Sequence, residues 1–203
     1  IVERGMEGFE RGRNLDKMGM KAQDTAELFF SNVKIPKENI LGEVGHGFLY
    51  LMQGLAEERL IAAVGCIANA RRAFDLTRDF VMERKIFGKP LSAKQNTQFK
   101  MAEMDAEIEV LEVFVDHLVA LHNEGKLSGN MAAKAKLQSN EVEWNMLDLG
   151  VQLHGGAGYM KEYPICNMFT DSRINRILAG STEIMKLIIS RDIFSENYSS
   201  NLD

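Results

Sequence analysis

Two adjacent glutamates, Glu57 and Glu58, are the residues of this sequence best suited to acid–base chemistry, because they lie in a long stretch of mostly apolar or small residues. Polar residues before them recur at spacings of four, three and four and form one stripe of a predicted helix: His46, Tyr50, Gln53 and Glu57. Glu58 is turned by about 100° from that stripe, and its neighbours at helical spacing are Leu51, Gly54, Leu55, Ala62 and Gly65. Desolvation by apolar neighbours makes a carboxylate a better proton acceptor. Glu58 is therefore our candidate general base.

Periodicity alone leaves two other roles open for Glu58. It could pair with an arginine in a buried structural network, or the helix could rotate enough to expose it to solvent. The same ambiguity holds for the neighbouring Arg59, because a guanidinium at this position could be a structural ion-pair partner or could contact a ligand.

A second candidate group combines a glycine-rich loop with several polar residues. The loop Gly155–Gly158 follows a predicted helix rather than a strand, so it is not the dinucleotide-binding fingerprint, and by itself it suits a helix C-cap and turn. Arg84 could bind phosphate through its guanidinium fork, or cap a helix end in water. Ser181 and Glu183 stand at the start of the last predicted helix, where N-terminal capping is the ordinary role of such residues.

The elements that must position these residues are mostly helical. Periodicity predicts helices over residues 44–84, 93–125, 129–152, 161–175 and 180–195. Glycine and proline separate them, notably Gly88 with Pro90, Gly125, and the loop after residue 154. Three long helices with short connections favour an antiparallel four-helix-type bundle in a mostly α fold.

Residues 1–42 have a different pattern, with short alternating runs and turns that predict a few strands. So few strands would leave open sheet edges, so we expect partner strands that this sequence does not contain. The expected domains are the terminal part of an incomplete β domain over residues 1–42, a helical bundle over 43–196, and a polar tail over 197–203. Because the sequence starts with Ile1, we expect a truncated or processed product.

Composition excludes several classes of partner. The 29 acidic and 24 basic residues are spread without long runs of one sign, which indicates neither nucleic-acid binding nor a polybasic membrane patch. No apolar run is long enough to predict a membrane span. Cys66 and Cys166 are single and far apart, so we expect two buried free thiols in a reducing compartment and no metal site.

Several separated segments together resemble the acyl-CoA dehydrogenase family over nearly the whole sequence. They are residues 15–42, residues 83–91 with Gln95, residues 152–159 with Glu162-Tyr163-Pro164, Asp171-Ser172-Arg173, and residues 179–184. The first segment resembles the last strands of that family's middle β domain. The others resemble segments of its C-terminal helical domain. The resemblance implies bound FAD, and it implies that the flavin does the redox chemistry.

The resemblance also implies a role for individual residues. FAD contacts would come from Arg84, Phe87, Gln95, Gln152, Gly155, Gly156, Ser181 and Glu183. The two glycines would let the backbone approach the adenine and pyrophosphate of a neighbouring subunit's cofactor. Taken singly, Phe87, Gln95 and Gln152 would be ordinary core or surface residues.

The position of the base separates the branches of the family. In its medium-chain and short-chain type members the base is a glutamate just before a Gly-Ser/Thr pair, but here that position holds Ala179, which cannot accept a proton. In its long-chain and isovaleryl type members the base precedes an arginine on the first long helix, and Glu58-Arg59 matches that pattern. The resemblance thus implies that Glu58 is the base and that Arg59, Ala179 and Gly180 contact substrate. The Ala179 backbone N–H would stabilise enolate-like charge.

The implied reaction is the dehydrogenation of an acyl-CoA thioester to a trans-2-enoyl-CoA in fatty acid β-oxidation, with electrons passed to an electron-transferring flavoprotein. The implied assembly is a homotetramer, a dimer of dimers, in the bacterial cytoplasm or the mitochondrial matrix. Three alternatives stay open: an acyl-CoA oxidase relative that uses oxygen, a catalytically silent helical bundle that serves assembly, and an acyl-CoA-binding module without redox chemistry.

Overall fold

The computed structural model describes residues 1–195, and the chain divides into two units after Gly54. Helices, including short 3-10 turns, make up 66% of residues 1–195, which confirms the predicted mostly α fold. The predicted polar tail over 197–203, and residue 196 at the end of the predicted bundle domain, lie outside the described residues.

The first unit contains a two-stranded antiparallel ribbon. Strand β1 (Phe9–Asn14) pairs with β2 (Ala26–Phe30), with Phe9 opposite Phe30 and their rings stacked at 5.1 Å between centroids. Every residue of β2 is exposed, including Leu28 and Phe29. A two-stranded ribbon is marginally stable in water, and three bulky apolar side chains in one exposed strand require a further packing surface.

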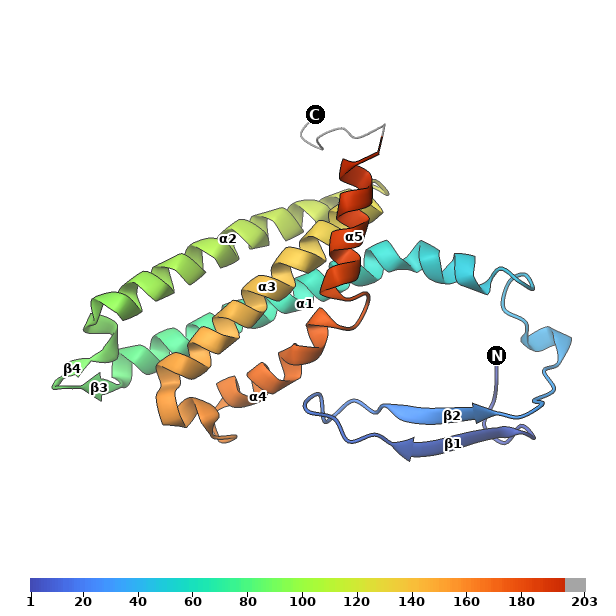
Figure 1. Cartoon of the computed structure of the whole chain (residues 1–203), viewed down its shortest axis with the longest axis horizontal. Helices are drawn as coiled ribbons and strands as arrows, with labels where there is room; N and C mark the ends of the chain where they lie inside the picture. Colours follow the sequence, from blue (N-terminus) through green and yellow to red (C-terminus); the bar gives the residue numbers. More distant parts are fainter. Residues whose placement is uncertain (196–203) are drawn as a thin grey trace. The chain divides into compact units, whose positions relative to one another are not determined.

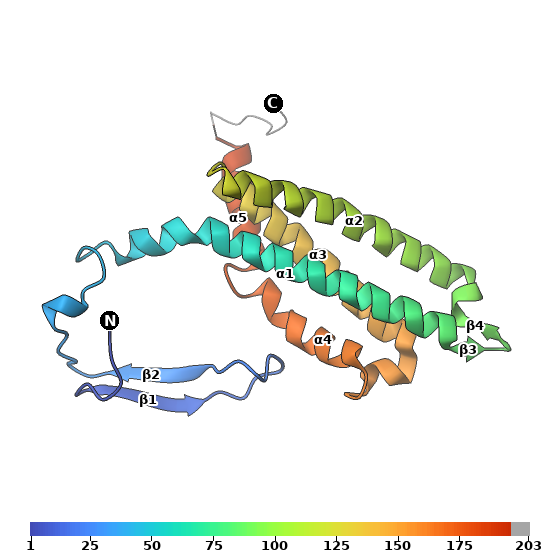
Figure 2. The same ribbon diagram turned by 180° about the vertical axis from the view of Figure 1, so that it is seen from behind.

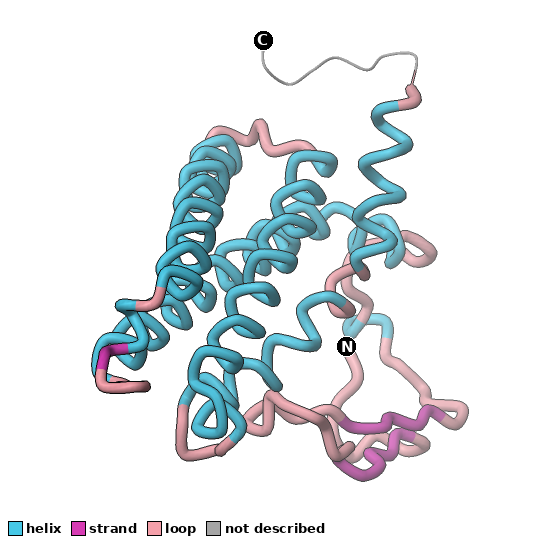
Figure 3. Tube along the Cα trace, turned by 60° about the vertical axis from the view of Figure 1, so that its left-hand side comes forward, coloured by secondary structure: helices cyan, strands magenta, loops and turns pink. Residues whose placement is uncertain are grey.

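The second unit begins at Leu55, within the long helix α1 (Gly47–Glu83). It continues with α2 (Gln95–Asn123), α3 (Gly129–His154), α4 (Pro164–Ser172) and α5 (Thr182–Ile193). From Leu55 onward α1 lies beside α2 and α3, and α2 runs opposite to both, as predicted for an antiparallel bundle (Figures 1 and 2). Helix α5 packs against α3, and so does α4 (Figure 3).

The bundle core is built from residues at helical spacing on the three long helices. Its fully buried members include Ala63 and Ala70 of α1, Ile108 and Leu118 of α2, and Met146 of α3. At roughly 1.5–3 kcal/mol for each large apolar side chain buried, this seam is the main source of the bundle's stability. Within residues 1–195, no helix is long and apolar enough to cross a bilayer.

Local sequence signals explain where the helices begin and end. The Ser128 hydroxyl accepts a hydrogen bond from the Met131 N–H at 3.1 Å and caps α3. Gly125, at φ +69°, follows α2, and the Lys126 N–H returns to the Leu121 carbonyl at 2.8 Å in a Schellman motif. Pro164 stands at the first turn of α4, where its missing N–H costs nothing.

Four of the five predicted helices are shorter in the structure, and two of them have clear local causes. The predicted helix over 44–84 ends at Glu83, because Phe87 and Gly88 both have positive φ and close a hairpin between β3 (Lys85–Ile86) and β4 (Lys89–Pro90). The short helix η2 (Leu91–Ala93) then leads into α2. The predicted helix over 161–175 divides into α4 and the short helix η4 (Arg173–Arg176).

Two helix glycines give a matched test of packing. A Cβ at Gly150 of α3 would lie 2.7 Å from Ile165 Cδ1 and 3.0 Å from Thr77 Oγ1, whereas a Cβ at Gly65 of α1 would meet open space. We predict that Gly150→Ala lowers the free energy of unfolding by about 1–3 kcal/mol through overpacking. Gly65→Ala should raise it by about 0.5–1 kcal/mol through helix propensity.

Urea unfolding of both variants, followed by circular dichroism, measures the two changes. Shifts of the same sign at Gly150 and Gly65 would contradict this account of the close α3–α4 contact.

Candidate functional site

Glu58, the predicted base, is exposed on α1. It makes no ion pair within residues 1–195, which removes the alternative of a buried structural network. The expectation that its neighbours desolvate it is wrong for this chain taken alone. Its stripe neighbour Gly65 is exposed and Ala62 is only half-buried, because this side of α1 faces away from the bundle core.

Glu57, predicted on a polar stripe, instead borders an apolar groove between α1 and α2. The groove is lined by Glu57, Leu60, Ile61, Val64, Val119 and His122. The two glutamates therefore face different surroundings, as the helical phase predicts, but the apolar lining belongs to Glu57.

Arg59 is buried beside the exposed Glu58, with 8% of its surface accessible. Burial lowers the pKa of Arg59, and the nearby Glu58 charge opposes that shift. Its Nε has no hydrogen-bond partner within residues 1–195. An arginine stays charged even when its pKa falls, so this buried guanidinium keeps a hydrogen-bond donor that residues 1–195 do not satisfy.

Ala179 and Gly180 form a tight turn between η4 and α5. Both have positive φ, +50° and +92°, a conformation that alanine rarely adopts. No hydrogen bond is formed by the Ala179 N–H with any residue in the range 1–195. The turn ends at Ser181, whose hydroxyl accepts from the Ile184 N–H at 3.4 Å and caps α5.

A charged hollow lies next to this turn. Its lining residues are Glu141, Arg173, Arg176, Ile177, Ser181, Thr182, Glu183 and Lys186. The pKa of Glu183 is lowered by hydrogen bonds from its own N–H and from Ser181, with smaller contributions from the charges of Lys186 and Arg176. Thr182 is 9% exposed, and its Oγ1 has no partner among the described residues. The hollow therefore suits an anionic or strongly polar ligand.

The other predicted cofactor residues gather at the far end of the bundle, where α1 ends, α2 begins and α3 ends. Arg84 and Gln95 are exposed there, and Phe87 at the tip of the β3–β4 hairpin is 95% exposed with φ +48°. Gln152 is exposed in the last turn of α3. Phe80 stacks on His154 at 4.1 Å between ring centroids and joins the ends of α1 and α3.

The glycines after α3 are needed at their positions for different physical reasons. Gly155 ends the helix at φ +61°, and a Cβ at Gly158 would lie 2.5 Å from the Val151 carbonyl oxygen. Gly156 has neither reason, since its φ is ordinary and a Cβ there would meet open space. Its missing side chain therefore leaves room for something outside this chain, which is what a cofactor phosphate would need.

His154 is buried against Phe80, and its Nδ1 is 2.7 Å from the Gly150 carbonyl oxygen. Burial lowers the pKa of His154, and the bond to Gly150 opposes the shift. This histidine ties α3 to α1 and is not exposed for proton chemistry.

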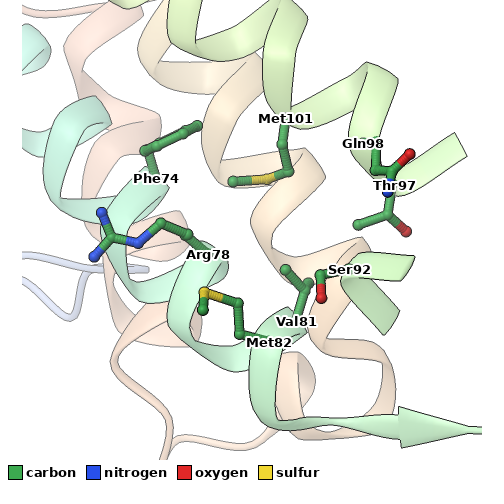
Figure 4. A pocket seen from close by; sticks show the side chains of 8 residues that line it. All are labelled: Phe74, Arg78, Val81, Met82, Ser92, Thr97, Gln98 and Met101. Carbon is green, nitrogen blue, oxygen red and sulfur yellow. The ribbon is translucent and has the colours of Figure 1, made fainter. Parts of the chain in front are cut away.

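A smaller hollow lies between the end of α1 and the start of α2 (Figure 4). Phe74, Val81 and Met82 line it from α1, and Met101 and Gln98 from α2. Ser92, Thr97 and Arg78 complete its lining, and the Arg78 guanidinium pairs with Asp75 and Asp79. The predicted site residues do not line this hollow.

Sequence reasoning missed a buried polar cluster behind the Ala179 turn. It comprises Cys66 and Asn69 of α1, Lys136, Asn140 and Glu143 of α3, and Asn175 of η4. The signal was available, because Lys136, Asn140 and Glu143 share the helical spacing of the buried residues of α3. Of the two cysteines predicted to be buried, Cys66 is buried and Cys166 is only half-buried.

Residues 45–194 match the family model described as "Acyl-CoA dehydrogenase, C-terminal domain". The chain belongs to the acyl-CoA dehydrogenase family. The predicted resemblance is therefore confirmed.

Three acyl-CoA dehydrogenases illustrate the similarity. The mitochondrial long-chain specific acyl-CoA dehydrogenase of Mus musculus is 46% identical over 197 residues, which cover 97% of this chain and 46% of the mouse protein. The crystal structure of the enzyme from Geobacillus kaustophilus is 44% identical with a TM-score of 0.93, and the match covers 96% of this chain and 51% of that one. A Bacillus anthracis acyl-CoA dehydrogenase complexed with FAD is 32% identical with a TM-score of 0.89, covering 95% and 36%. The chain thus spans about half the length of the curated relatives that it matches.

In this member of the acyl-CoA dehydrogenase family, Glu143 gives a pH-dependent test of the buried cluster. Burial raises the pKa of Glu143 above its ordinary value of 4.5, and bonds from Asn175, Asn69 and Cys66 oppose the shift. A group with a raised folded pKa contributes stability that is present below its unfolded pKa and is lost as the pH rises through the folded pKa.

We therefore predict that the free energy of unfolding of Glu143→Gln, minus that of the wild type, increases as the pH rises from 4.5 to 7. Urea unfolding at several pH values measures the slope of this difference, whatever its absolute offset. A difference that is flat, or that falls with pH, would contradict the burial cost of the Glu143 carboxylate.

Proposed function

We propose that the protein carrying this chain is an FAD-dependent acyl-CoA dehydrogenase in which Glu58 is the catalytic base. The observation that carries the proposal is the free carboxylate of Glu58: it is exposed, has no ion-pair partner within residues 1–195, and directly precedes a buried arginine with an unbonded Nε. Ala179 occupies the position of the competing base and has no side chain able to accept a proton.

In the proposed reaction Glu58 removes the α-proton of an acyl-CoA thioester, and the C–H electrons form the new α,β double bond of a trans-2-enoyl-CoA. FAD, when bound, would accept the β-hydrogen with its electron pair as hydride. The Ala179 N–H, which has no partner within residues 1–195, would donate to the thioester carbonyl oxygen as negative charge develops there. Arg59 and Gly180 would border the substrate, with Arg59 restraining the segment that carries the base.

The residues of the chain fit FAD at two places. At one end of the bundle, the open Gly155-Gly156 backbone lies at the same end as the exposed Arg84, Phe87, Gln95 and Gln152, a combination that suits phosphate groups. At the other, Ser181 and Glu183 border the charged hollow at the start of α5.

Helix α3 separates these two places. Lys136, whose Nζ binds the Gly180 carbonyl beside Ser181, is 18 residues before His154 on the same helix, which is about 27 Å at the α-helical rise. We propose that the two places contact different flavins, each shared between copies of the chain. This supports the proposed homotetramer, a dimer of dimers.

We further propose that an electron-transferring flavoprotein accepts the electrons, as the family resemblance implies for fatty acid β-oxidation. The mouse relative is a mitochondrial protein. We therefore propose the mitochondrial matrix for a eukaryotic source, and the cytoplasm for a bacterial one.

Glu58 and Glu57 provide a matched pair of variants for the base. In the FAD-loaded full-length protein, Glu58→Gln should lower the rate of flavin reduction by acyl-CoA at least about 100-fold, because a general base contributes about that much or more. Glu57→Gln should have a much smaller effect. Stopped-flow loss of flavin absorbance measures both rates, and the visible spectrum before mixing shows that FAD is retained.

Equal losses in the two variants would overturn the assignment of the base. Acyl-CoA binding without any bleaching of the wild-type flavin would favour a binding module instead. Rapid oxygen consumption by the reduced protein without a flavoprotein acceptor would favour an oxidase.

Gly156 tests the proposed cofactor contact separately from activity. Gly156→Ala should leave the unfolding midpoint of the cofactor-free chain nearly unchanged, since its Cβ meets open space. It should raise the FAD dissociation constant at least about tenfold, which corresponds to about 1.4 kcal/mol. Gly129 of α3 is also exposed, and a Cβ there would also meet open space, so Gly129→Ala is the control. Unchanged FAD affinity in Gly156→Ala, measured by flavin fluorescence titration, would argue against this contact.

A further inference from the structure

Lys136 of α3 is completely buried, and its ammonium group holds the turn that precedes α5. Its Nζ donates hydrogen bonds to the Gly180 carbonyl at 2.6 Å and to the Asn175 carbonyl at 3.2 Å. Burial lowers the pKa of Lys136, and the charge of the nearby Arg59 lowers it further. Burying an ammonium group is costly unless its donors are used. These two carbonyls are therefore specific partners for its charge.

The Asn175 end of the turn is held by the same face of α3. Asn140 Nδ2 donates to the Asn175 carbonyl at 2.9 Å, and Asn175 Nδ2 donates to Glu143 at 2.8 Å. Glu143 also accepts from Asn69 Nδ2 of α1 at 2.7 Å. Both carbonyls that Lys136 binds are thus fixed to the centre of the bundle, one on each side of residues 176–179.

Ala179, between these two fixed points, is held in an unfavourable conformation. A residue with a Cβ at φ +50° has a strained backbone. Such strain persists only where surrounding contacts enforce it. The bond from Lys136 to the adjacent Gly180 carbonyl supplies that restraint, and the Ala179 N–H is left without a partner in residues 1–195.

We propose that Lys136 is a positioning residue for the dehydrogenation, which holds the Ala179 N–H where it can bind the thioester carbonyl oxygen. The inference rests on the proposed function. It assigns a task to a residue on a different helix from the base, and Lys136 acts only through the Gly180 carbonyl without touching substrate.

The backbone conformation of the Ala179 turn can be followed by NMR in the cofactor-free chain. The sequence contains only two Leu-Ala pairs, Leu55-Ala56 and Leu178-Ala179. Labelling with ¹³C-carbonyl leucine and ¹⁵N-alanine therefore gives two amide signals in an HNCO spectrum, one of which reports Ala179 and the other an internal control on α1.

In Lys136→Met, which keeps the length and apolar stem of the side chain, the Ala179 signal should move by more than its line width while the Ala56 signal stays in place. Lys136→Arg, which keeps the charge and the donors, should move it less. An unmoved Ala179 signal in folded Lys136→Met would overturn the proposal. A fall in thermal stability alone would not rescue it, because a purely structural lysine would also lower stability when replaced.

A second variant covers a failure of Lys136→Met to fold. Lys136→Gln is shorter but carries two N–H donors, and it should shift the Ala179 signal in the same direction. Unfolding of both variants would also overturn the proposal, because it would make Lys136 a residue of the folding core.

The catalytic consequence is measured in the FAD-loaded full-length protein. Lys136→Met should lower the rate of flavin reduction by acyl-CoA about 100-fold, as expected for a misplaced or lost oxyanion donor. The acyl-CoA dissociation constant should change little, and Lys136→Arg should recover part of the rate. A wild-type rate in Lys136→Met would reject the positioning role.

The two proposals fail in different ways. If Glu58→Gln still reduces flavin normally, the proposed base is wrong, whatever the amide spectra show. If Glu58 behaves as proposed but the Ala179 signal and the rate ignore Lys136→Met, only the positioning role is lost.

Discussion

The burial of ionised and amide side chains on one face of α3 is the constraint on which the functional end of this bundle depends. Lys136 and Glu143 are 0% and 2% exposed, and Asn140 lies one turn from Lys136. Groups of this kind are tolerated inside a protein only when partners satisfy them. The partners come from α1 and from the segment after α4. That segment cannot remain helical throughout, because its carbonyl oxygens must turn toward α3.

This constraint links two regions that are far apart in sequence. Asn69 lies on α1 about three turns beyond Glu58, and Asn175 precedes the Ala179 turn. Both donate to the same Glu143 carboxylate. The helix that carries the candidate base and the segment that leads into the Ala179 turn are therefore both hydrogen-bonded to the same residue of α3. A shift of either element would break one of these hydrogen bonds, so the two bonds restrain their relative position.

Much of the bundle could be predicted from the sequence. Helical periodicity and glycine placement identify all five helices, and Ala179 excludes itself as a base by its chemistry. The exposure of Glu58 could not be predicted, because periodicity shows which residues share a face but not what covers that face. Lys136 was missed for a related reason: a lysine in an amphipathic pattern is ordinarily on the solvent side, and its burial depends on the distant carbonyls of Asn175 and Gly180.

Phe87 carries a consequence for how related sequences should vary. A phenylalanine that is 95% exposed and held at φ +48° destabilises an isolated chain in two ways. Its ring is in contact with water, and its backbone conformation is unfavourable for a residue with a Cβ. Asparagine or glycine would relieve both losses at this hairpin tip. Mutational drift should therefore remove the aromatic ring wherever nothing outside the chain covers it. Under the proposed FAD contact, the residue at position 87 separates related proteins that still bind the cofactor from those that keep only the bundle.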